Sequence, residues 1–408
     1  MALCVAVVGA GYAGLACAVE LADAGVAVEV FEASRTLGGR ARAVELDGMS
    51  VDNGAHILVG AYRETLRLMQ KVGADETALK RRSLHLEFPG HVSVAAPRLP
   101  APLHLGWALL RAQGLSFKEK LAALRFMRAQ QARAFRLPAD LPADRLLADQ
   151  PERVRRFLWE PLCLAALNTP PQLASAQVFL NVLRDSLAAD RAASDLLLPA
   201  TDLSRLFPEP AARHIEARGG KVHRATRIGA LAALDRFDHT VIAVAPYHLA
   251  ALAPEIAARF PFAWQPIATV YLQYPETARL VFPMLGLAGA PAQWLFDRGA
   301  LCGQPGLLAA VISGAGAWQE PGHATLAAST HAQIAALLPG LRPPRKTWTI
   351  EEKRATFACT PGLERPPTAT AIPGVWLAGD YVAGDYPATI EGAVRSGIAA
   401  ARAVIGAA

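Results

Sequence analysis

The chain has 408 residues, of which 52% are hydrophobic and 19% charged, a composition that excludes intrinsic disorder and supplies core for two domains. No apolar run reaches the roughly 18–20 residues of a membrane-spanning helix. The net charge of +6 is concentrated in residues 63–136, which carry 14 Lys/Arg against 5 Asp/Glu. Five scattered cysteines without a CxxC pair indicate reduced thiols, a cytoplasmic location and no metal site.

The first predicted elements surround a glycine turn. Residues 3–8 form a continuous apolar run, which is typical of a parallel strand buried on both faces, and the opening residues do not resemble an export signal. A helix that ends at Gly25 follows the turn, and a second strand ends in an acidic residue. The predicted nucleotide-binding residues here are Gly9, Gly11, Tyr12, Ala13, Gly14, Glu32 and Ala33.

Each part of this motif has a mechanical role. Gly9 permits the tight turn, Gly11 lets the backbone approach a pyrophosphate, and Gly14 allows the helix to pack closely on the sheet. The pyrophosphate then binds at the positive N-terminus of the helix. Glu32 follows Gly14 by 18 residues and is placed to accept hydrogen bonds from ribose hydroxyls. This pattern alone suits NAD as well as FAD.

The residues after the second strand favour FAD. Arg35 is followed by Gly38, Gly39 and Arg40, and this segment resembles the Arg-x-Gly-Gly-Arg signature of the amine oxidase and phytoene desaturase superfamily. The glycines let the chain pass close to the cofactor, and Arg40 can offset pyrophosphate charge. The resemblance implies an α/β fold: a Rossmann-like FAD-binding domain of the glutathione-reductase/amine-oxidase type with an interleaved α+β substrate domain. For Arg42, a cofactor contact and a surface position are both open.

A second block narrows the resemblance. Residues 51–62 contain Asn53, Gly54, Ala55 and His56, all predicted to contact the cofactor. The block resembles the segment that follows the arginine motif in bacterial squalene-associated FAD-dependent desaturases, also described as hydroxysqualene dehydroxylases. In relatives the matching segment runs along the isoalloxazine ring.

The most basic stretch, residues 104–137, is interleaved with apolar residues. If it is one helix, Phe117, Leu121, Leu124 and Phe135 gather on one side, and Lys118, Arg125 and Arg136 form an adjacent stripe. This arrangement predicts an interfacial helix on an anionic membrane, at the inner face of the cell membrane. A solvated basic face is the alternative. No recognition motif supports nucleic-acid binding.

Strands over residues 218–231 and 239–246 are expected to complete the nucleotide-binding sheet, and in relatives the backbone at the position of Val222 contacts adenine. A last strand ends in Gly379 and Asp380, and a helix begins near Pro387. The resemblance implies that Asp380 binds the ribityl or pyrophosphate region. It also implies that the helix start, with Thr389 and Ile390, faces the flavin N1–C2=O edge, where it stabilises negative charge. For Glu391, a functional role and a favourable first-turn position are both open.

The predicted domains are therefore discontinuous. Residues 1–75, 205–250 and 345–408 are assigned to FAD binding, and residues 76–204 and 251–344 to the substrate domain, with its membrane-contact helices. The resemblance covers nearly the full chain, because blocks at 352–357, 376–380 and 386–397 also match.

In that family, hydroxysqualene is reduced to squalene with electrons from reduced FAD. The reaction needs a hydride from flavin N5, an acid for the departing hydroxyl, and a pocket that keeps a C30 chain from water. His56 and Lys353 are the candidate acids, although His56 has packing as an alternative role and Lys353 rests on a loose match to amine oxidases. Tyr381 and Tyr386 flank the flavin loop, and Asp52 is interpreted as a structural residue.

Three other functions remain open. The first is a phytoene-type carotenoid desaturase, which runs the flavin oxidatively. The second is a flavin amine oxidase, and the third is an FAD-binding scaffold for prenyl-synthase partners. A single glycine-rich motif indicates that electrons come from an external reductant or from loosely bound NAD(P)H. The expected partners are a hydrophobic isoprenoid substrate and upstream squalene-pathway enzymes.

Overall fold

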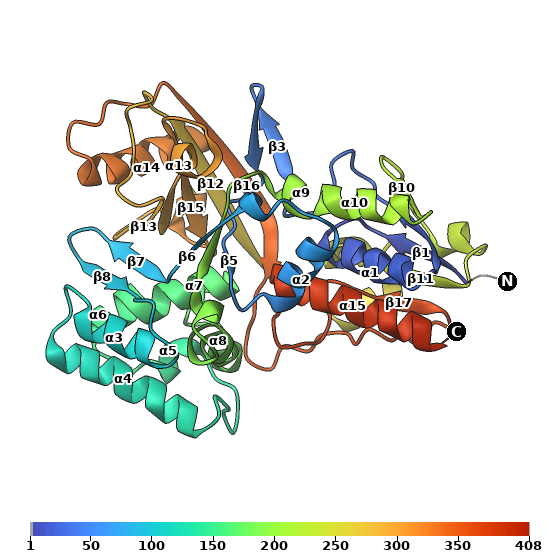
Figure 1. Ribbon diagram of the computed structural model, residues 1–408, viewed down its shortest axis with the longest axis horizontal. Helices are drawn as coiled ribbons and strands as arrows, with labels where there is room; N and C mark the ends of the chain where they lie inside the picture. Colours follow the sequence, from blue (N-terminus) through green and yellow to red (C-terminus); the bar gives the residue numbers. More distant parts are fainter. Residues whose placement is uncertain (1–2, 408) are drawn as a thin grey trace.

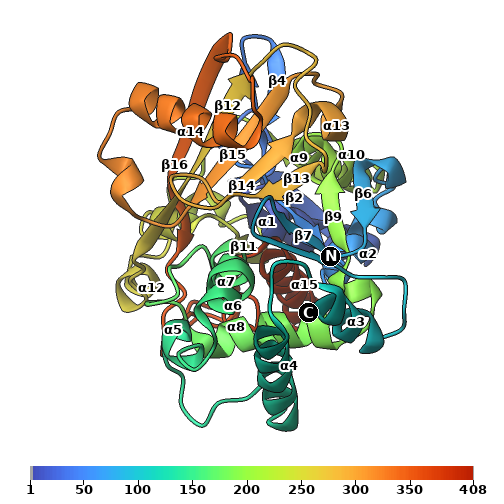
Figure 2. The same ribbon diagram turned by 90° about the vertical axis from the view of Figure 1, so that its left-hand side faces the viewer.

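A computed structural model of the chain describes residues 3–407, apart from the side chain of Glu76. Figure 1 shows three regions: a parallel sheet with its helices, an antiparallel sheet with one long covering helix, and a group of helices beneath it. Figure 2, turned by 90°, shows the antiparallel sheet above and the helical group below. All five cysteines are free thiols.

The parallel sheet is built from distant parts of the chain. Its strands, in spatial order, are β10 (Lys221–His223), β2 (Ala27–Phe31), β1 (Cys4–Val8), β11 (His239–Ile242) and β17 (Val375–Leu377). All four pairings are parallel. The central strand β1 is buried from Val5 to Val8, as its continuous apolar sequence predicts.

Helices α1 (Tyr12–Asp23) and α15 (Ile390–Ala407) pack closely on each other beside this sheet. Small residues allow the approach: a Cβ atom on Gly397 would lie 2.1 Å from the Ala13 carbonyl oxygen. Two further helices flank this pair, α10 (Pro208–Ala217) against α1 and α2 (Arg63–Lys71) against α15.

The antiparallel sheet has its strands in the order β13 (Met284–Gly286), β14 (Trp294–Asp297), β15 (Leu307–Ser313), β12 (Trp264–Gln273) and β16 (Lys346–Phe357). Helix α14 (His323–Leu337) packs against β12 and β16. The sequence assigned residues 345–408 to the FAD-binding domain, but residues 346–357 belong to the antiparallel sheet. Only the segment that follows them enters the parallel sheet. The length of β16, 12 residues, lets it reach the cofactor region while pairing with β12.

The remaining strands form small antiparallel sheets. They are β3 (Ala43–Leu46) with β4 (Met49–Asp52), β9 (Leu196–Pro199) between β5 (Leu58–Val59) and β6 (Leu79–Arg82), and β7 (His85–Phe88) with β8 (Val92–Ala95). The helical group comprises α3 (Leu103–Arg111), α4 (Phe117–Ala132), α5 (Ala143–Leu146), α6 (Glu152–Val154), α7 (Glu160–Leu167) and α8 (Ala176–Leu183). The other short helices are α9 (Leu203–Leu206), α11 (Pro246–Leu249), α12 (Pro254–Arg259) and α13 (Arg298–Cys302).

The prediction of one amphipathic helix through the basic stretch is wrong in its geometry. Helix α4 starts at a Ser116 capping box and ends at Ala132, so Phe135 lies beyond it with a positive φ of 55° and a buried ring. Leu121 and Leu124 are partly buried. Of the four residues expected on the apolar side, only Phe117 is strongly exposed, at 71%.

The exposed apolar side chains gather on the preceding helix instead. Leu103, Trp107 and Leu110 of α3 are 61%, 45% and 53% exposed, and their spacing of four and three residues places them on one face. His104 and Ala108, on another side of α3, are buried and face the protein interior. Within residues 3–407, no helix combines the length and the apolar character needed to cross a bilayer.

Candidate cofactor and active site

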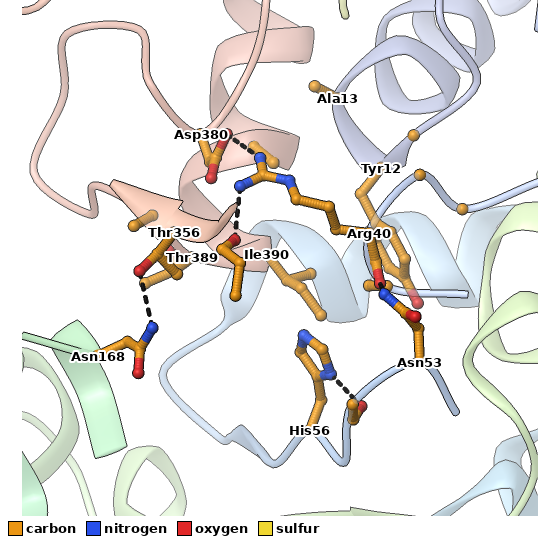
Figure 3. Close-up of a pocket in the computed structure, with 18 of the residues that line it drawn as sticks. Tyr12, Ala13, Arg40, Asn53, His56, Asn168, Thr356, Asp380, Thr389 and Ile390 are labelled. Carbon is orange, nitrogen blue, oxygen red and sulfur yellow. Dashed lines mark hydrogen bonds and ion pairs between the residues drawn. The ribbon is translucent and has the colours of Figure 1, made fainter. Parts of the chain in front are cut away.

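One large cavity, of about 700 Å³, runs from the glycine turn into the space between the antiparallel sheet and the helical group. Figure 3 shows part of its lining. Most residues predicted from sequence line it: Gly9, Gly11, Tyr12, Ala13, Glu32, Ala33, Gly38, Gly39, Arg40, Asn53, Gly54, Ala55, His56, Gly379, Asp380, Thr389 and Ile390. Gly14, Val222 and Lys353 are not among the lining residues.

The glycine turn is shaped for an anion. Gly9 has a φ of +108°, and a Cβ atom there would lie 2.6 Å from the Ala243 carbonyl oxygen. Gly14 serves packing, because its Cβ would lie 1.9 Å from the Gly9 oxygen. Gly11 is the N-cap of α1 and no side chain caps the helix, so its first amides are available to a pyrophosphate.

Glu32 is held in place by the turn itself. One carboxylate oxygen accepts a hydrogen bond from the Ala10 amide and the other from the Ser34 amide, both at 2.8 Å. The fixed carboxylate lines the cavity at the end of β2, where a ribose would lie beside the helix N-terminus.

Val222, the predicted adenine contact, does not line the cavity. It lies in β10, paired with Val30. The cavity lining closest to it in sequence comes from residues 226–229, which follow β10.

Arg40 and Asp380 join the two ends of the chain. An Arg40 Nη atom lies 2.6 Å from a carboxylate oxygen of Asp380, and the other Nη donates to the Ala355 carbonyl oxygen at 2.7 Å. Burial lowers the pKa of Arg40, but the neighbouring Asp380 raises it and the net shift is upward. Arg40 therefore stays cationic beside the cavity, as Figure 3 shows, and Asp380 fixes its direction.

The C-terminal helix begins later than predicted. Pro387 lies in the preceding turn, and α15 starts at Ile390. Thr389 caps it, since its hydroxyl accepts from the Gly392 amide at 2.9 Å and donates to the Tyr386 carbonyl oxygen. Thr389 and Ile390 line the cavity, so the positive end of this helix faces it as expected.

Glu391 turns away from the cavity. Its fully buried carboxylate accepts hydrogen bonds from the Glu64 and Thr65 amides, the Thr65 hydroxyl and Arg395. The residue therefore ties α2 to α15 and has a structural role.

His56 points into the cavity. Its Nδ1 atom lies 2.6 Å from the Gly54 carbonyl oxygen, so Nδ1 carries a proton and donates it to that carbonyl. Nε2 is turned toward the open centre of the site in Figure 3. Burial lowers the pKa of His56 from its ordinary value near 6.5. Asn53 is fixed nearby by its amide, 3.3 Å from both the Arg40 carbonyl oxygen and Glu352.

The structure does not place Lys353 at the flavin position. Its side chain is exposed, while Glu352, Ala355 and Thr356 of the same strand line the cavity. Of the two tyrosines of the final loop, Tyr386 lines the cavity, whereas Tyr381 is fully buried.

Asp52 is a structural residue, as interpreted from the sequence. It accepts from the Leu203 amide and pairs with Arg298, each at 2.8 Å, and both charged side chains are buried. Burial raises the pKa of Asp52.

The far part of the cavity is apolar and could not be found from local motifs. It is lined by Leu84, Leu86, Leu162, Val182, Leu183, Leu187, Leu196, Met284, Trp294, Phe296 and Val311. These residues come from separate strands and helices, and only the tertiary fold brings them together. Tyr386 is a polar residue that also lines the cavity, with its hydroxyl donating to Asp185 on a π-helical turn (184–188).

An FAD molecule fits these features. The uncapped helix and glycine turn suit a pyrophosphate, Glu32 suits a ribose, and the Arg40–Asp380 pair with the α15 N-terminus suits the flavin half. Within the described part of the chain, no group of three His, Cys, Asp or Glu could hold a metal ion.

Solved structures share the fold along the whole chain. An oxidoreductase from Methanosarcina mazei has a TM-score of 0.73 at 16% identity, covering 97% of this chain and 99% of its own. Cyclohexylamine oxidase from Brevibacterium oxydans has a TM-score of 0.66 at 16% identity, covering 100% and 99%. At these identities the likeness concerns the fold.

Sequence comparison identifies the family. The model of the flavin containing amine oxidoreductases matches residues 12–405. Hydroxysqualene dehydroxylase of Rhodopseudomonas palustris is 30% identical over 100% of this chain and 99% of its own, and that of Sinorhizobium fredii is 27% identical over 97% and 96%. A zeta-carotene desaturase of Synechocystis is 25% identical over 98% and 97%. The chain therefore belongs to the flavin containing amine oxidoreductase family, with hydroxysqualene dehydroxylases among its full-length relatives, and is an FAD-dependent oxidoreductase.

Proposed function

We propose that this enzyme reduces hydroxysqualene to squalene, replacing an allylic C–OH bond by C–H. The observation that carries the proposal is the long apolar extension of the cofactor cavity, which suits a C30 hydrocarbon chain better than a small amine. The full-length relatives named hydroxysqualene dehydroxylase support it. Carotene desaturases also match the chain, so oxidative desaturation is the second candidate.

Reduced FAD supplies the hydride when it is bound, after reduction by an external donor. The chain's own residues exclude water and hold the allylic carbon beside the cofactor site. Trp294 and Phe296 of β14 line the same cavity, and their ring faces can stabilise positive charge that develops as the hydroxyl leaves.

The departing hydroxyl needs a proton, and we assign its delivery to His56. Its Nδ1–H is held by the Gly54 carbonyl, which leaves Nε2 to carry the transferable proton into the cavity. Tyr386 is the competing donor. Burial and the bond to Asp185 raise the pKa of Tyr386 to about 12, so it keeps its proton, but that proton is already donated to Asp185.

The reaction is tested anaerobically with purified enzyme reduced by dithionite. Hydroxysqualene should give squalene as FAD absorbance returns, whereas oxidised enzyme should leave phytoene unchanged. Conversion of phytoene by the oxidised enzyme, with no squalene from the reduced enzyme, would identify a desaturase instead. An enzyme that binds FAD but converts neither compound would match the scaffold function.

We also propose that the substrate is drawn from an anionic membrane surface contacted by α3. The proposal is supported by Leu103, Trp107, Leu110 and Phe117, which are half of the large hydrophobic side chains exposed in the described chain and lie within 15 consecutive residues. Trp107 suits a bilayer interface, and the Arg111 guanidinium lies 5.3 Å from its ring centroid. Phe117 opens α4, whose exposed Lys118 and Arg125 add positive charge.

A further inference from the structure

A second, smaller pocket of about 290 Å³ lies beside the main cavity. Leu196 and Met284 line both, so the two spaces share a wall. The pocket is formed where the sheet of β6 and β9 meets β7 and β13. No motif in the sequence marks this place.

The pocket lining is rich in basic residues. Three exposed arginines, Arg81, Arg82 and Arg98, line it together with His85. Arg81 lies 3.2 Å from a carboxylate oxygen of Asp195.

That carboxylate is shared, since Arg191 lies 3.6 Å from its other oxygen. His85 lies 3.3 Å from Glu87. Arg82 and Arg98 make no ion pair or side-chain hydrogen bond with any described residue. Positive charge therefore exceeds negative charge in the pocket, and two guanidinium groups are available to a ligand.

The rest of the pocket lining is mostly apolar. Leu198, Phe282 and Pro283 line it together with the two shared residues, and the Phe282 ring packs edge-on against His85 at 4.2 Å between centroids. Guanidinium groups bind phosphate through paired N–H donors with a geometry that Lys cannot match. A ligand that satisfies both sides carries a phosphate and an apolar chain.

We propose that this pocket binds the phosphate group of an amphipathic anion, with Arg82 and Arg98 as its principal ligands. The attached chain contacts the apolar wall beside the redox cavity. A membrane phospholipid and a soluble prenyl phosphate or diphosphate present the same chemistry. This site is independent of which isoprenoid the flavin acts on, so its test does not use turnover.

The experiment measures binding by calorimetry to the FAD-loaded protein. The probes are inorganic pyrophosphate, dodecyl phosphate, and phosphatidylcholine vesicles with and without phosphatidylglycerol. The test variant is Arg82→Gln/Arg98→Gln. Arg342→Gln/Arg402→Gln, which removes two exposed arginines outside the pocket and outside the basic stretch, is the matched control. FAD absorbance and the thermal midpoint verify the fold of each variant.

Wild-type protein should bind dodecyl phosphate more tightly than pyrophosphate, and the pocket variant should lose at least about tenfold in affinity while the control keeps it. Loss confined to the vesicles assigns the phosphate to a lipid headgroup, and loss confined to dodecyl phosphate assigns it to a soluble anion. Equal losses in both variants, or no loss in the pocket variant with any probe, would overturn the proposal. The same holds if the wild type binds no phosphate probe.

Discussion

At the scale of single residues, the site depends on side chains fixed by backbone groups. Glu32 is held by two amides, His56 by one carbonyl, and Arg40 by a carbonyl and a carboxylate. These bonds fix the direction of each side chain beside the cavity. Such anchoring reduces the conformational freedom that ligand binding must otherwise remove.

The assignment of His56 predicts a pH dependence. Because burial lowers the pKa of His56 below 6.5, its imidazolium form is the minority at pH 7 and increases as the pH falls. If this form protonates the leaving hydroxyl, the single-turnover rate of reduced enzyme rises about tenfold per pH unit on acidification, until the pKa is reached. Stopped-flow recovery of FAD absorbance between pH 5 and 9 measures it.

His56→Gln introduces a neutral amide that can still form hydrogen bonds but cannot titrate, so this variant should retain FAD, lose about 10²-fold in rate and lose the pH slope. Tyr386→Phe should preserve the slope. A wild-type rate that is constant across this pH range would contradict the role of His56, and a rate lost in Tyr386→Phe but kept in His56→Gln would transfer that role to Tyr386.

At the scale of elements, the two helices whose N-termini face the cofactor also pack on each other. The contact of α1 with α15 depends on Gly397, which allows the backbone of α15 to approach Ala13 in the first turn of α1. The pyrophosphate end and the flavin end of the site are therefore mechanically coupled through one helix–helix contact.

Gly397→Ala tests this coupling. The added Cβ would lie 2.1 Å from a backbone oxygen, so the helices must separate, which costs about 1–3 kcal/mol of folding free energy. We expect a lower thermal midpoint and faster loss of FAD on gel filtration. Gly406→Ala, in the same helix but with no atom within 4 Å of the added Cβ, should be neutral or slightly stabilising. Equal thermal midpoints and equal FAD loss in the two variants would show that the contact of Gly397 with Ala13 does not contribute to stability or to FAD retention.

At the scale of the whole molecule, the proposed membrane face and the apolar cavity belong to adjoining parts of the fold. The inner side of α3 reaches the cavity wall through His104, whose Nε2 lies 3.2 Å from the hydroxyl of Ser194, a lining residue. The proposed membrane face is therefore joined to the wall of the cavity by this buried contact.

Vesicle co-sedimentation tests the membrane face. Trp107→Ala/Leu110→Ala removes two exposed side chains, each worth about 1–3 kcal/mol if fully buried in lipid, so partitioning should fall at least tenfold. Phosphatidylglycerol in the vesicles should strengthen wild-type binding. Added salt should weaken the additional binding that this anionic lipid provides. Ile372→Ala/Ile405→Ala, on exposed residues elsewhere, is the control. Unchanged binding in the α3 variant would exclude this face.

The cofactor half of the molecule could be predicted from sequence because each motif is contiguous and the local backbone geometry requires its glycines. Three features could not be predicted. The helical wheel assumed one helix from Phe117 to Phe135, but the chain leaves helical geometry after Ala132. The strand containing Lys353 joined the other sheet. The apolar cavity draws single residues from many elements, and no local pattern marks such a surface.

The pairing of Arg40 with Asp380 also has a consequence for how the FAD site forms during translation of the chain. A ribosome adding about 5–20 residues per second needs tens of seconds to pass from one partner to the other. During that time the nascent glycine turn exists without the strand and helix that complete its neighbourhood, because β17 and α15 are made after the other segments of the site. The FAD site therefore forms only after residues 375–407 have been synthesised, and chains truncated before Asp380 should accumulate without FAD.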